Sequence, residues 1–173
     1  MAKVYLVTGG ARSGKSRYAE NLAKSLCSDA KRRCYIATAE AFDDEMKDRI
    51  KKHQDRRVGE FFTVEEPVEL GKAITDAQDR SNVILVDCLT VWMGNLLFYN
   101  RLEETDKLIR ALKNAKCPIV LVTNETGMGI VPENELSRQF RDESGFLNQA
   151  VAEVADSVVF MVCGLPMFVK GKV

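Results

Sequence analysis

Short apolar runs rich in β-branched residues alternate along the chain with segments of helical periodicity. Five runs predict strands, and they cover Lys3–Thr8, Arg33–Thr38, Val83–Asp87, Pro118–Thr123 and Ser157–Val162. Continuous apolar runs of this length are typical of strands that are buried on both faces of a parallel sheet. A less regular run over Glu60–Val64 predicts one further strand.

Between the strands, apolar residues recur at the spacing of an amphipathic helix. The three clearest groups are Tyr18, Leu22 and Leu26; Leu108, Ala111 and Leu112; and Leu136, Phe140, Leu147, Val151 and Val154. Alternation of strands with helices predicts an α/β fold, with a mostly parallel sheet and helices on both of its faces. Trp92 lies in an apolar setting and is expected to pack in the core.

The chain has 173 residues, and 46% of them are hydrophobic. A length of this order is usual for one compact domain, and no internal repeat or Pro/Gly-rich linker interrupts it. We therefore expect residues 1–173 to form a single domain. Lys and Arg number 25, as do Asp and Glu, so the net charge is zero. A balanced charge gives no overall field for nucleic acid or an anionic membrane surface, whereas small phosphorylated ligands remain possible.

Cysteine use and the absence of long apolar segments indicate a cytoplasmic protein. The five cysteines are widely spaced, form no C-x-x-C pair and have only one histidine to join them in a metal cluster. They are expected to be reduced thiols. No apolar run approaches the roughly 20 residues that span a bilayer, and the first residues lack the features of a signal peptide.

A glycine-rich motif follows the first predicted strand and begins the first predicted helix. It has the form G-x-x-x-x-G-K-S and comprises Gly9, Gly10, Ala11, Arg12, Ser13, Gly14, Lys15 and Ser16. In such a loop, backbone N–H groups and the positive end of a helix surround phosphates, the lysine reaches the terminal phosphates and the serine binds magnesium. The alternative is a glycine turn that binds nothing, but the strand and helix on either side favour a nucleotide site.

Asp87 ends the predicted strand Val83–Asp87 and is the candidate for a second magnesium ligand. Alone it would more often be a turn or helix-capping residue, but the phosphate loop favours the magnesium role. Together the two features predict a nucleoside triphosphate with Mg²⁺. They are compatible with a kinase, a nucleotidyltransferase, a motor ATPase or a switch GTPase.

His53, the one histidine, lies in the highly charged segment Asp43–Arg57. The pattern of charges there is typical of a solvated surface helix, in which His53 would have no special role. Alternatively, its neutral imidazole could attack an α-phosphorus while Lys52, Arg56 or Arg57 neutralises the developing charge. Spacing alone does not decide between these two interpretations.

The stretch from Val122 to Asp142, VTNETGMGIVPENELSRQFRD, leaves a predicted strand as a loop and enters a helix. Together with VTGGARSGKSRYAE, YIATAEAFDDEM, DCLTVWMGNLLF and VADSVVFMVCGLP, it makes the whole chain resemble the bifunctional adenosylcobinamide kinase and adenosylcobinamide-phosphate guanylyltransferase family of cobalamin biosynthesis. The resemblance implies a phosphate-loop NTPase-like fold of the RecA type. It also implies two reactions: phosphorylation of adenosylcobinamide with ATP or GTP, then transfer of GMP from GTP to the new phosphate, with release of pyrophosphate.

The same resemblance implies roles for particular residues. Lys15 acts in catalysis, and His53 becomes the guanylylated nucleophile; some relatives have two adjacent histidines here, where this chain has Lys52 before His53. Besides the phosphate loop, the residues implied in nucleotide contact are Ala37, Thr38, Ala39, Gln54, Asp55, Arg56, Arg57, Glu65 and Asp87. Mg²⁺ would be held by Ser16 and Asp87. The family also implies a homo-oligomer, with a trimer as the expected size.

Two other functions remain open from the residues alone. A single-activity phosphate-loop kinase would need no His53, and a nucleotide-dependent switch module would need no acceptor. The base that would accept the hydroxyl proton in a kinase reaction is also open, with Asp87 and Glu125 as the candidates.

Overall fold

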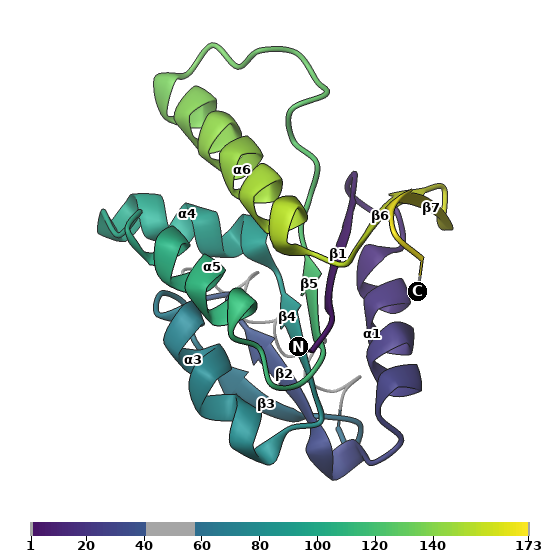
Figure 1. Ribbon diagram of the computed structural model, residues 1–173. Coiled ribbons are helices and arrows are strands. Elements are labelled where there is room, and N and C mark those ends of the chain that lie inside the picture. The colour runs from purple at the N-terminus through teal and green to yellow at the C-terminus, as the bar shows by residue number, and fades with distance from the viewer. Residues whose placement is uncertain (1, 41–57, 173) are drawn as a thin grey trace.

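The computed structural model describes residues 2–40 and 58–172, and within them the chain forms one mixed sheet flanked by helices (Figure 1). The strand order across the sheet is β3-β2-β4-β5-β1-β6-β7. Neighbouring strands from β3 to β6 pair in parallel, and β7 pairs antiparallel with β6. The strands are β1 Val4–Gly9, β2 Arg33–Ala37, β3 Phe62–Glu65, β4 Val83–Asp87, β5 Ile119–Val122, β6 Ser157–Val162 and β7 Leu165–Lys170.

Helices cover both faces of this sheet. Helix α1, Lys15–Leu26, lies on one face, as Figure 1 shows. The helices on the other face are α3 Leu70–Ala77, α4 Leu89–Tyr99, α5 Glu104–Lys113 and α6 Glu135–Val154. Short 3₁₀ turns at Ala30–Arg32 and Gln78–Arg80 lead into β2 and toward β4.

Each face of the sheet has its own apolar core. Tyr5 and Val7 of β1 pack with Ala19 and Leu22 of α1, whereas Leu6 belongs to the cluster beneath α3, α4, α5 and α6. Successive side chains of a strand point to opposite faces, so a strand between two helical layers must be apolar throughout. This is why the central strands read as continuous apolar runs in the sequence.

The α/β architecture and the strand predictions are confirmed. The five secure runs form β1, β2, β4, β5 and β6, and the less regular run forms β3 at Phe62–Glu65. Strand β7 was not predicted; all of its residues are exposed, so it lacks the burial that makes the other runs recognisable. Trp92 is fully buried and donates its Nε1–H to the carbonyl oxygen of Val68 at 2.8 Å, which confirms its place in the core.

The cysteines are free thiols: Cys27, Cys34 and Cys117 are buried, Cys88 is half-buried and Cys163 is exposed. Among the helices of the described residues, none has the length and apolar character needed to cross a membrane.

Candidate functional site

The glycine-rich loop leaves β1 and enters α1 through backbone conformations that depend on glycine. Gly9 has φ +149° and Gly14 has φ +93°, and Arg12 between them has φ +58°. A Cβ atom at Gly9 would lie 2.6 Å from the carbonyl oxygen of Met161, well inside the contact distance of real Cβ atoms. The close approach of the loop to β6 is therefore possible only without a side chain at this position.

Backbone hydrogen bonds from two distant segments hold the loop. Glu125 N donates to Gly9 O at 3.0 Å, and Gly164 N donates to Ser13 O at 3.1 Å. Gly164 lies in the tight turn between β6 and β7, with φ +80°. Residues from three parts of the chain thus meet at the loop, and these bonds hold its shape.

Lys15 is buried and points back over the loop, where its Nζ donates to Gly10 O at 2.7 Å. Burial lowers the pKa of this ammonium group, while the electrostatic influence of Cys88 and Asp87 acts in the opposite direction. The start of α1 carries no acidic residue in its first turn, and Gly14 supplies no side-chain cap. The N–H groups and positive dipole at this helix end are therefore available to an anion, with Lys15 beside them.

Asp87 lies at the carboxyl end of β4, which is separated from β1 by β5. Its Oδ2 accepts a hydrogen bond from the Tyr35 hydroxyl at 2.8 Å, and no hydrogen bond from the described residues reaches Oδ1. Asp87 is half-buried, as is Ser16 in the first turn of α1. A carboxylate oxygen and a hydroxyl are the hard oxygen ligands that suit Mg²⁺ alongside phosphates and water.

Sheet register aligns three of the sequence-predicted site residues. Ala37 of β2 pairs with Asp87 of β4 on one side and with Glu65 of β3 on the other. Glu65 is exposed. These residues lie in a row at the same edge of the sheet from which the phosphate loop leaves β1, because parallel strands end together there.

Thr38 follows Ala37 and joins the ends of β2 and β4. Its hydroxyl donates to Cys88 O at 2.8 Å and accepts from Cys88 N at 3.0 Å. The carbonyl oxygen of Thr38 accepts from Asn95 Nδ2 at 2.7 Å. Thr38 is fully buried, so its side chain fixes this edge of the sheet, and Ala37 and Ala39 beside it are half-buried. The predicted site residues His53, Gln54, Asp55, Arg56 and Arg57 lie outside the described residues.

A polar network at the end of β5 was not identified from the sequence. Thr90 Oγ1 of α4 accepts from Asn124 N at 2.6 Å, and Thr123 Oγ1 donates to Asn148 Oδ1 of α6 at 2.9 Å. The network links the strand beside the phosphate loop to both helices. Its members are common polar residues far apart in the sequence, so their only signal was that Thr123 ends a predicted strand and Asn124 follows it.

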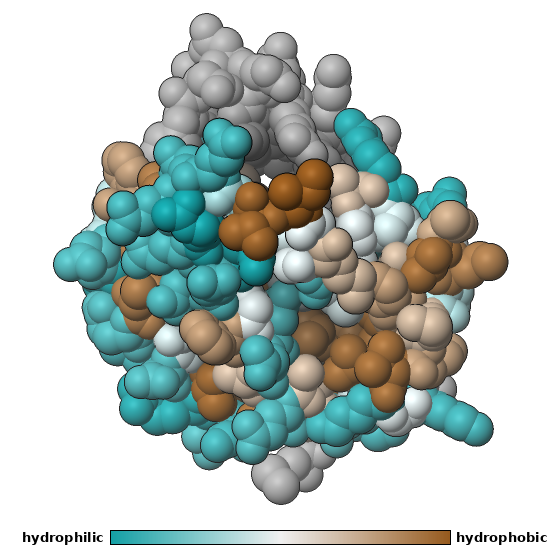
Figure 2. Space-filling view, turned by 90° about the horizontal axis from the view of Figure 1, so that it is seen from above, coloured by the Kyte–Doolittle hydropathy of each residue, from teal (hydrophilic) through white to brown (hydrophobic). Residues whose placement is uncertain are grey.

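The loop after β5 ends in a surface of mixed character. Met128, Ile130, Val131 and Leu136 are exposed, with Ile130 at 96%. Figure 2 looks onto this end of the molecule and shows apolar groups at the surface among polar ones. This loop and the start of α6 project beyond the strands (Figure 1).

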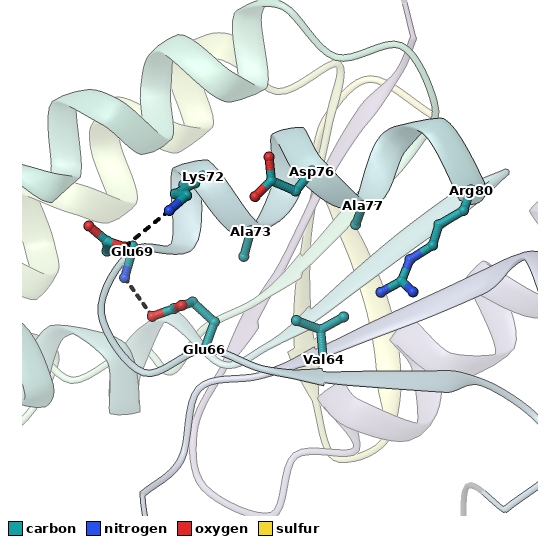
Figure 3. Close-up of a pocket in the computed structure, with 8 residues that line it drawn as sticks. All are labelled: Val64, Glu66, Glu69, Lys72, Ala73, Asp76, Ala77 and Arg80. Atoms are coloured by element: carbon teal, nitrogen blue, oxygen red, sulfur yellow. Dashed lines mark hydrogen bonds and ion pairs between the residues drawn. The ribbon is translucent and has the colours of Figure 1, made fainter.

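A pocket of about 390 Å³ lies elsewhere, between α3 and the edge strand β3 (Figure 3). Its charged groups are mostly engaged with one another or with the backbone. Glu66 Oε1 accepts from Val68 N and Glu69 N, Lys72 pairs with Glu69 at 3.8 Å, and the Arg80 guanidinium lies 4.6 Å from the centre of the Phe62 ring. None of the sequence-predicted site residues lines this pocket, so it is not the candidate site.

Comparison with known proteins gives one family. The sequence model of the family described as cobinamide kinase / cobinamide phosphate guanyltransferase matches residues 5–169. The bifunctional adenosylcobalamin biosynthesis protein CobP of Pseudomonas aeruginosa is 46% identical, over 96% of this chain and 97% of the relative. The corresponding protein CobU of Salmonella typhimurium is 43% identical, over 95% of this chain and 98% of its own length.

Solved structures with a similar fold are much more distant in sequence. A KaiC-like protein of Pyrococcus horikoshii superposes with a TM-score of 0.54 at 14% identity, over 91% of this chain and 70% of its own. The flagellar accessory protein FlaH of Methanocaldococcus jannaschii gives a TM-score of 0.55 at 13% identity, over 98% of this chain and 79% of its own. At such identities the likeness concerns the fold alone, and it confirms the predicted phosphate-loop, RecA-type α/β class.

Proposed function

This chain belongs to the cobinamide kinase / cobinamide phosphate guanyltransferase family, and on that premise we propose how its own residues carry out the two reactions. The chain is a bifunctional enzyme of adenosylcobalamin biosynthesis, with a kinase activity and a guanylyltransferase activity. The observation that carries our assignment of the site is the preformed glycine loop, with Lys15 folded over it at an uncapped helix start.

In the kinase reaction, the loop N–H groups and the start of α1 bind the triphosphate of ATP or GTP. The hydroxyl oxygen of adenosylcobinamide bonds to the γ-phosphorus and loses its proton, the bond to the β-phosphate oxygen breaks, and the nucleoside diphosphate leaves. Little covalent chemistry is asked of the protein, so positioning and charge stabilisation are its main contribution. Lys15 supplies that stabilisation. Burial disfavours its charged ammonium form, and the negative phosphates of a bound nucleotide offset this cost.

Ser16 and Asp87 are the residues that would hold Mg²⁺. The hydroxyl of Ser16 and the Oδ1 atom of Asp87 would provide oxygen ligands, and the Tyr35 hydroxyl fixes the orientation of the carboxylate through Oδ2. When bound, the ion neutralises charge on the phosphate oxygens.

In the guanylyl reaction, we assign the nucleophile to His53. A ring nitrogen attacks the α-phosphorus of GTP, a P–N bond forms and pyrophosphate leaves. A phosphate oxygen of adenosylcobinamide phosphate then attacks the same phosphorus, the P–N bond breaks, and adenosylcobinamide-GDP forms while the imidazole is released. A covalent intermediate divides one difficult displacement into two easier ones. By the same assignment, Ala37–Ala39, Gln54–Arg57 and Glu65 surround the nucleotide.

We also propose that the enzyme works as a homo-oligomer in the cytoplasm, with a trimer as its expected size. Support for self-association comes from β7, an edge strand on which Leu165, Met167, Phe168 and Val169 are between 46% and 70% exposed. An exposed apolar edge strand offers a surface on which another chain can pair or pack. The free thiols agree with a reducing compartment.

Incubation of the enzyme with GTP labelled at the α-phosphate, followed by denaturation, tests the covalent step. We expect protein-bound label that survives alkali and is lost in acid, as a phosphoramidate is. His53→Ala should abolish the label and the guanylyl transfer yet keep the kinase activity, because phosphoryl transfer does not use the imidazole. Lys51→Ala is the matched control, because no role in the reaction is assigned to this lysine, and it should retain the label. A folded wild-type enzyme that carries no label would contradict the intermediate, while kinase activity lost with His53 would contradict the separation of the two roles.

A further inference from the structure

Helix α6 carries three polar side chains on one face, Arg141, Ser144 and Asn148. At about 100° per residue, positions i, i+3 and i+7 of a helix fall within a sector of about 60°. We refer to these three residues as the α6 stripe.

Asn148 shows where the α6 stripe faces. Its Oδ1 accepts from Thr123 Oγ1 at 2.9 Å, and its Nδ2 donates to Asn124 O at 3.4 Å. Thr123 and Asn124 directly follow β5, and the next residue, Glu125, is bonded to Gly9 at the start of the phosphate loop. The α6 stripe therefore faces the edge of the sheet where the nucleotide site lies.

Arg141 lies beyond that edge. After its last turn, α6 reaches the opposite edge of the sheet, where Asp156 Oδ2 accepts from Val4 N at 2.8 Å at the beginning of β1. Arg141 precedes Asn148 by seven residues, which places it about 10 Å farther out along the helix. Figure 1 shows the first turns of α6 projecting past the strand ends. This is the edge of the sheet from which the phosphate loop leaves β1.

The outer two residues of the α6 stripe carry buried polar atoms that lack a partner among the described residues. These are Arg141 Nη1 and Ser144 Oγ, and Ser144 is only 4% exposed. The ionic neighbour of Arg141 is Asp142, whose Oδ1 lies 3.7 Å from Nε on a side chain that is 62% exposed. An exposed ion pair of this kind contributes little to the stability of the fold, whereas a buried donor without a hydrogen-bond partner destabilises it. Asn148, by contrast, is satisfied within the protein.

We propose that Arg141 binds the phosphate group of the acceptor in the guanylyl reaction, with the Ser144 hydroxyl as a second donor. The inference rests on the proposed function, since it takes the acceptor of the second reaction to be a phosphate monoester. A guanidinium group matches two phosphate oxygens at once, and a phosphate brings enough acceptor atoms for both unpartnered donors. Arg141 then distinguishes the phosphorylated acceptor from the unphosphorylated one, and so commits the product of the first reaction to the second.

The test is equilibrium dialysis without GTP, followed through the visible absorbance of the corrin ring. The probes are cobinamide phosphate and cobinamide, and the variants are Arg141→Gln, Arg141→Lys and Ser144→Ala. Arg138→Gln is the matched control, because this arginine lies nearly one turn earlier in α6 and donates to the carbonyl oxygens of Pro132 and Glu133. We expect Arg141→Gln to weaken binding of cobinamide phosphate by about 10- to 100-fold and to leave cobinamide unchanged.

Arg141→Lys should recover part of the loss, since it keeps the charge but not the two-pronged geometry. The inference would be overturned if Arg141→Gln weakened the binding of both probes equally or of neither. Equal affinity of the wild-type enzyme for the two probes would also overturn it. If Arg141→Gln fails to fold, Arg141→Lys and Ser144→Ala decide by the same ratio of affinities. Because no GTP is present, the result is independent of His53 labelling, so failure of the proposed intermediate and failure of the phosphate contact give different outcomes.

Discussion

Two loops leave neighbouring parallel strands at the same edge of the sheet, yet they differ in almost every physical respect. The phosphate loop after β1 has Ser13 and Lys15 buried and receives hydrogen bonds from Glu125 and Gly164. The loop after β5 has Met128 79% exposed and Ile130 96% exposed. Asn124 and Glu125 at its start bond to Thr90 and Gly9, but the bonds beyond them are local, such as the one from Gly127 N to Glu125 Oε1 at 2.5 Å.

The difference suits the two kinds of ligand that the proposed function requires. A triphosphate is small and highly charged, and a rigid set of N–H donors binds it without losing much conformational entropy. A corrinoid acceptor is large and partly apolar, and exposed apolar side chains suit a ligand of that size. The phosphate loop is thus held by bonds within the chain, whereas the exposed side chains of the second loop would gain contacts only on association with a ligand or another chain.

The largest effect should come from Lys15→Gln, because the side chain that folds over the phosphate position loses its charge. We expect the kinase kcat to fall by about 10²- to 10³-fold with little change in stability. The measurement is phosphoryl transfer to cobinamide from ATP labelled at the γ-phosphate. Lys24→Gln is the control, because Lys24 forms a partly exposed ion pair with Glu60. A loss of less than about tenfold would show that the backbone alone accounts for phosphate binding.

Gly9→Ala tests the rigidity of the first loop directly. The added Cβ would meet Met161 O, so we expect the free energy of unfolding in urea to fall by about 1–3 kcal/mol. The matched change in the second loop is Gly129→Ala, where no atom lies within 4 Å of the added Cβ and the effect should stay within about 0.5 kcal/mol. Equal effects at the two glycines would remove the contrast between the loops.

The smallest effect on stability should come from Ile130→Ser. An isoleucine that is 96% exposed buries almost nothing in the free chain, so the free energy of unfolding should change by less than about 0.5 kcal/mol. Binding of cobinamide, measured by dialysis, should nevertheless weaken if the second loop recognises the acceptor. If Ile130→Ser strongly lowered the free energy of unfolding at low protein concentration, where chains do not associate, the loop would be packed within its own chain instead.

Most of the sheet and the phosphate loop could be predicted from the sequence, because their signals are local. A strand covered on both faces must be apolar where it is buried, as β4 is up to its terminal Asp87, and a tight phosphate-binding turn needs its glycines and lysine at fixed spacing. Strand β7 escaped prediction since its residues are exposed, and pairing with β6 rather than burial makes it a strand. The roles of His53 and of Gln54–Arg57 stay predictions.

The sequence by itself determined the α/β class, the phosphate loop and the family, each of which depends on residues that are close together along the chain. Only the tertiary structure decided that β5 lies between β1 and β4, that the turn at Gly164 holds Ser13, and that Arg141 and Ser144 face the nucleotide edge with unpartnered donors. The physical reason is that burial and hydrogen bonding join groups more than a hundred residues apart, and local patterns carry no information on such pairings.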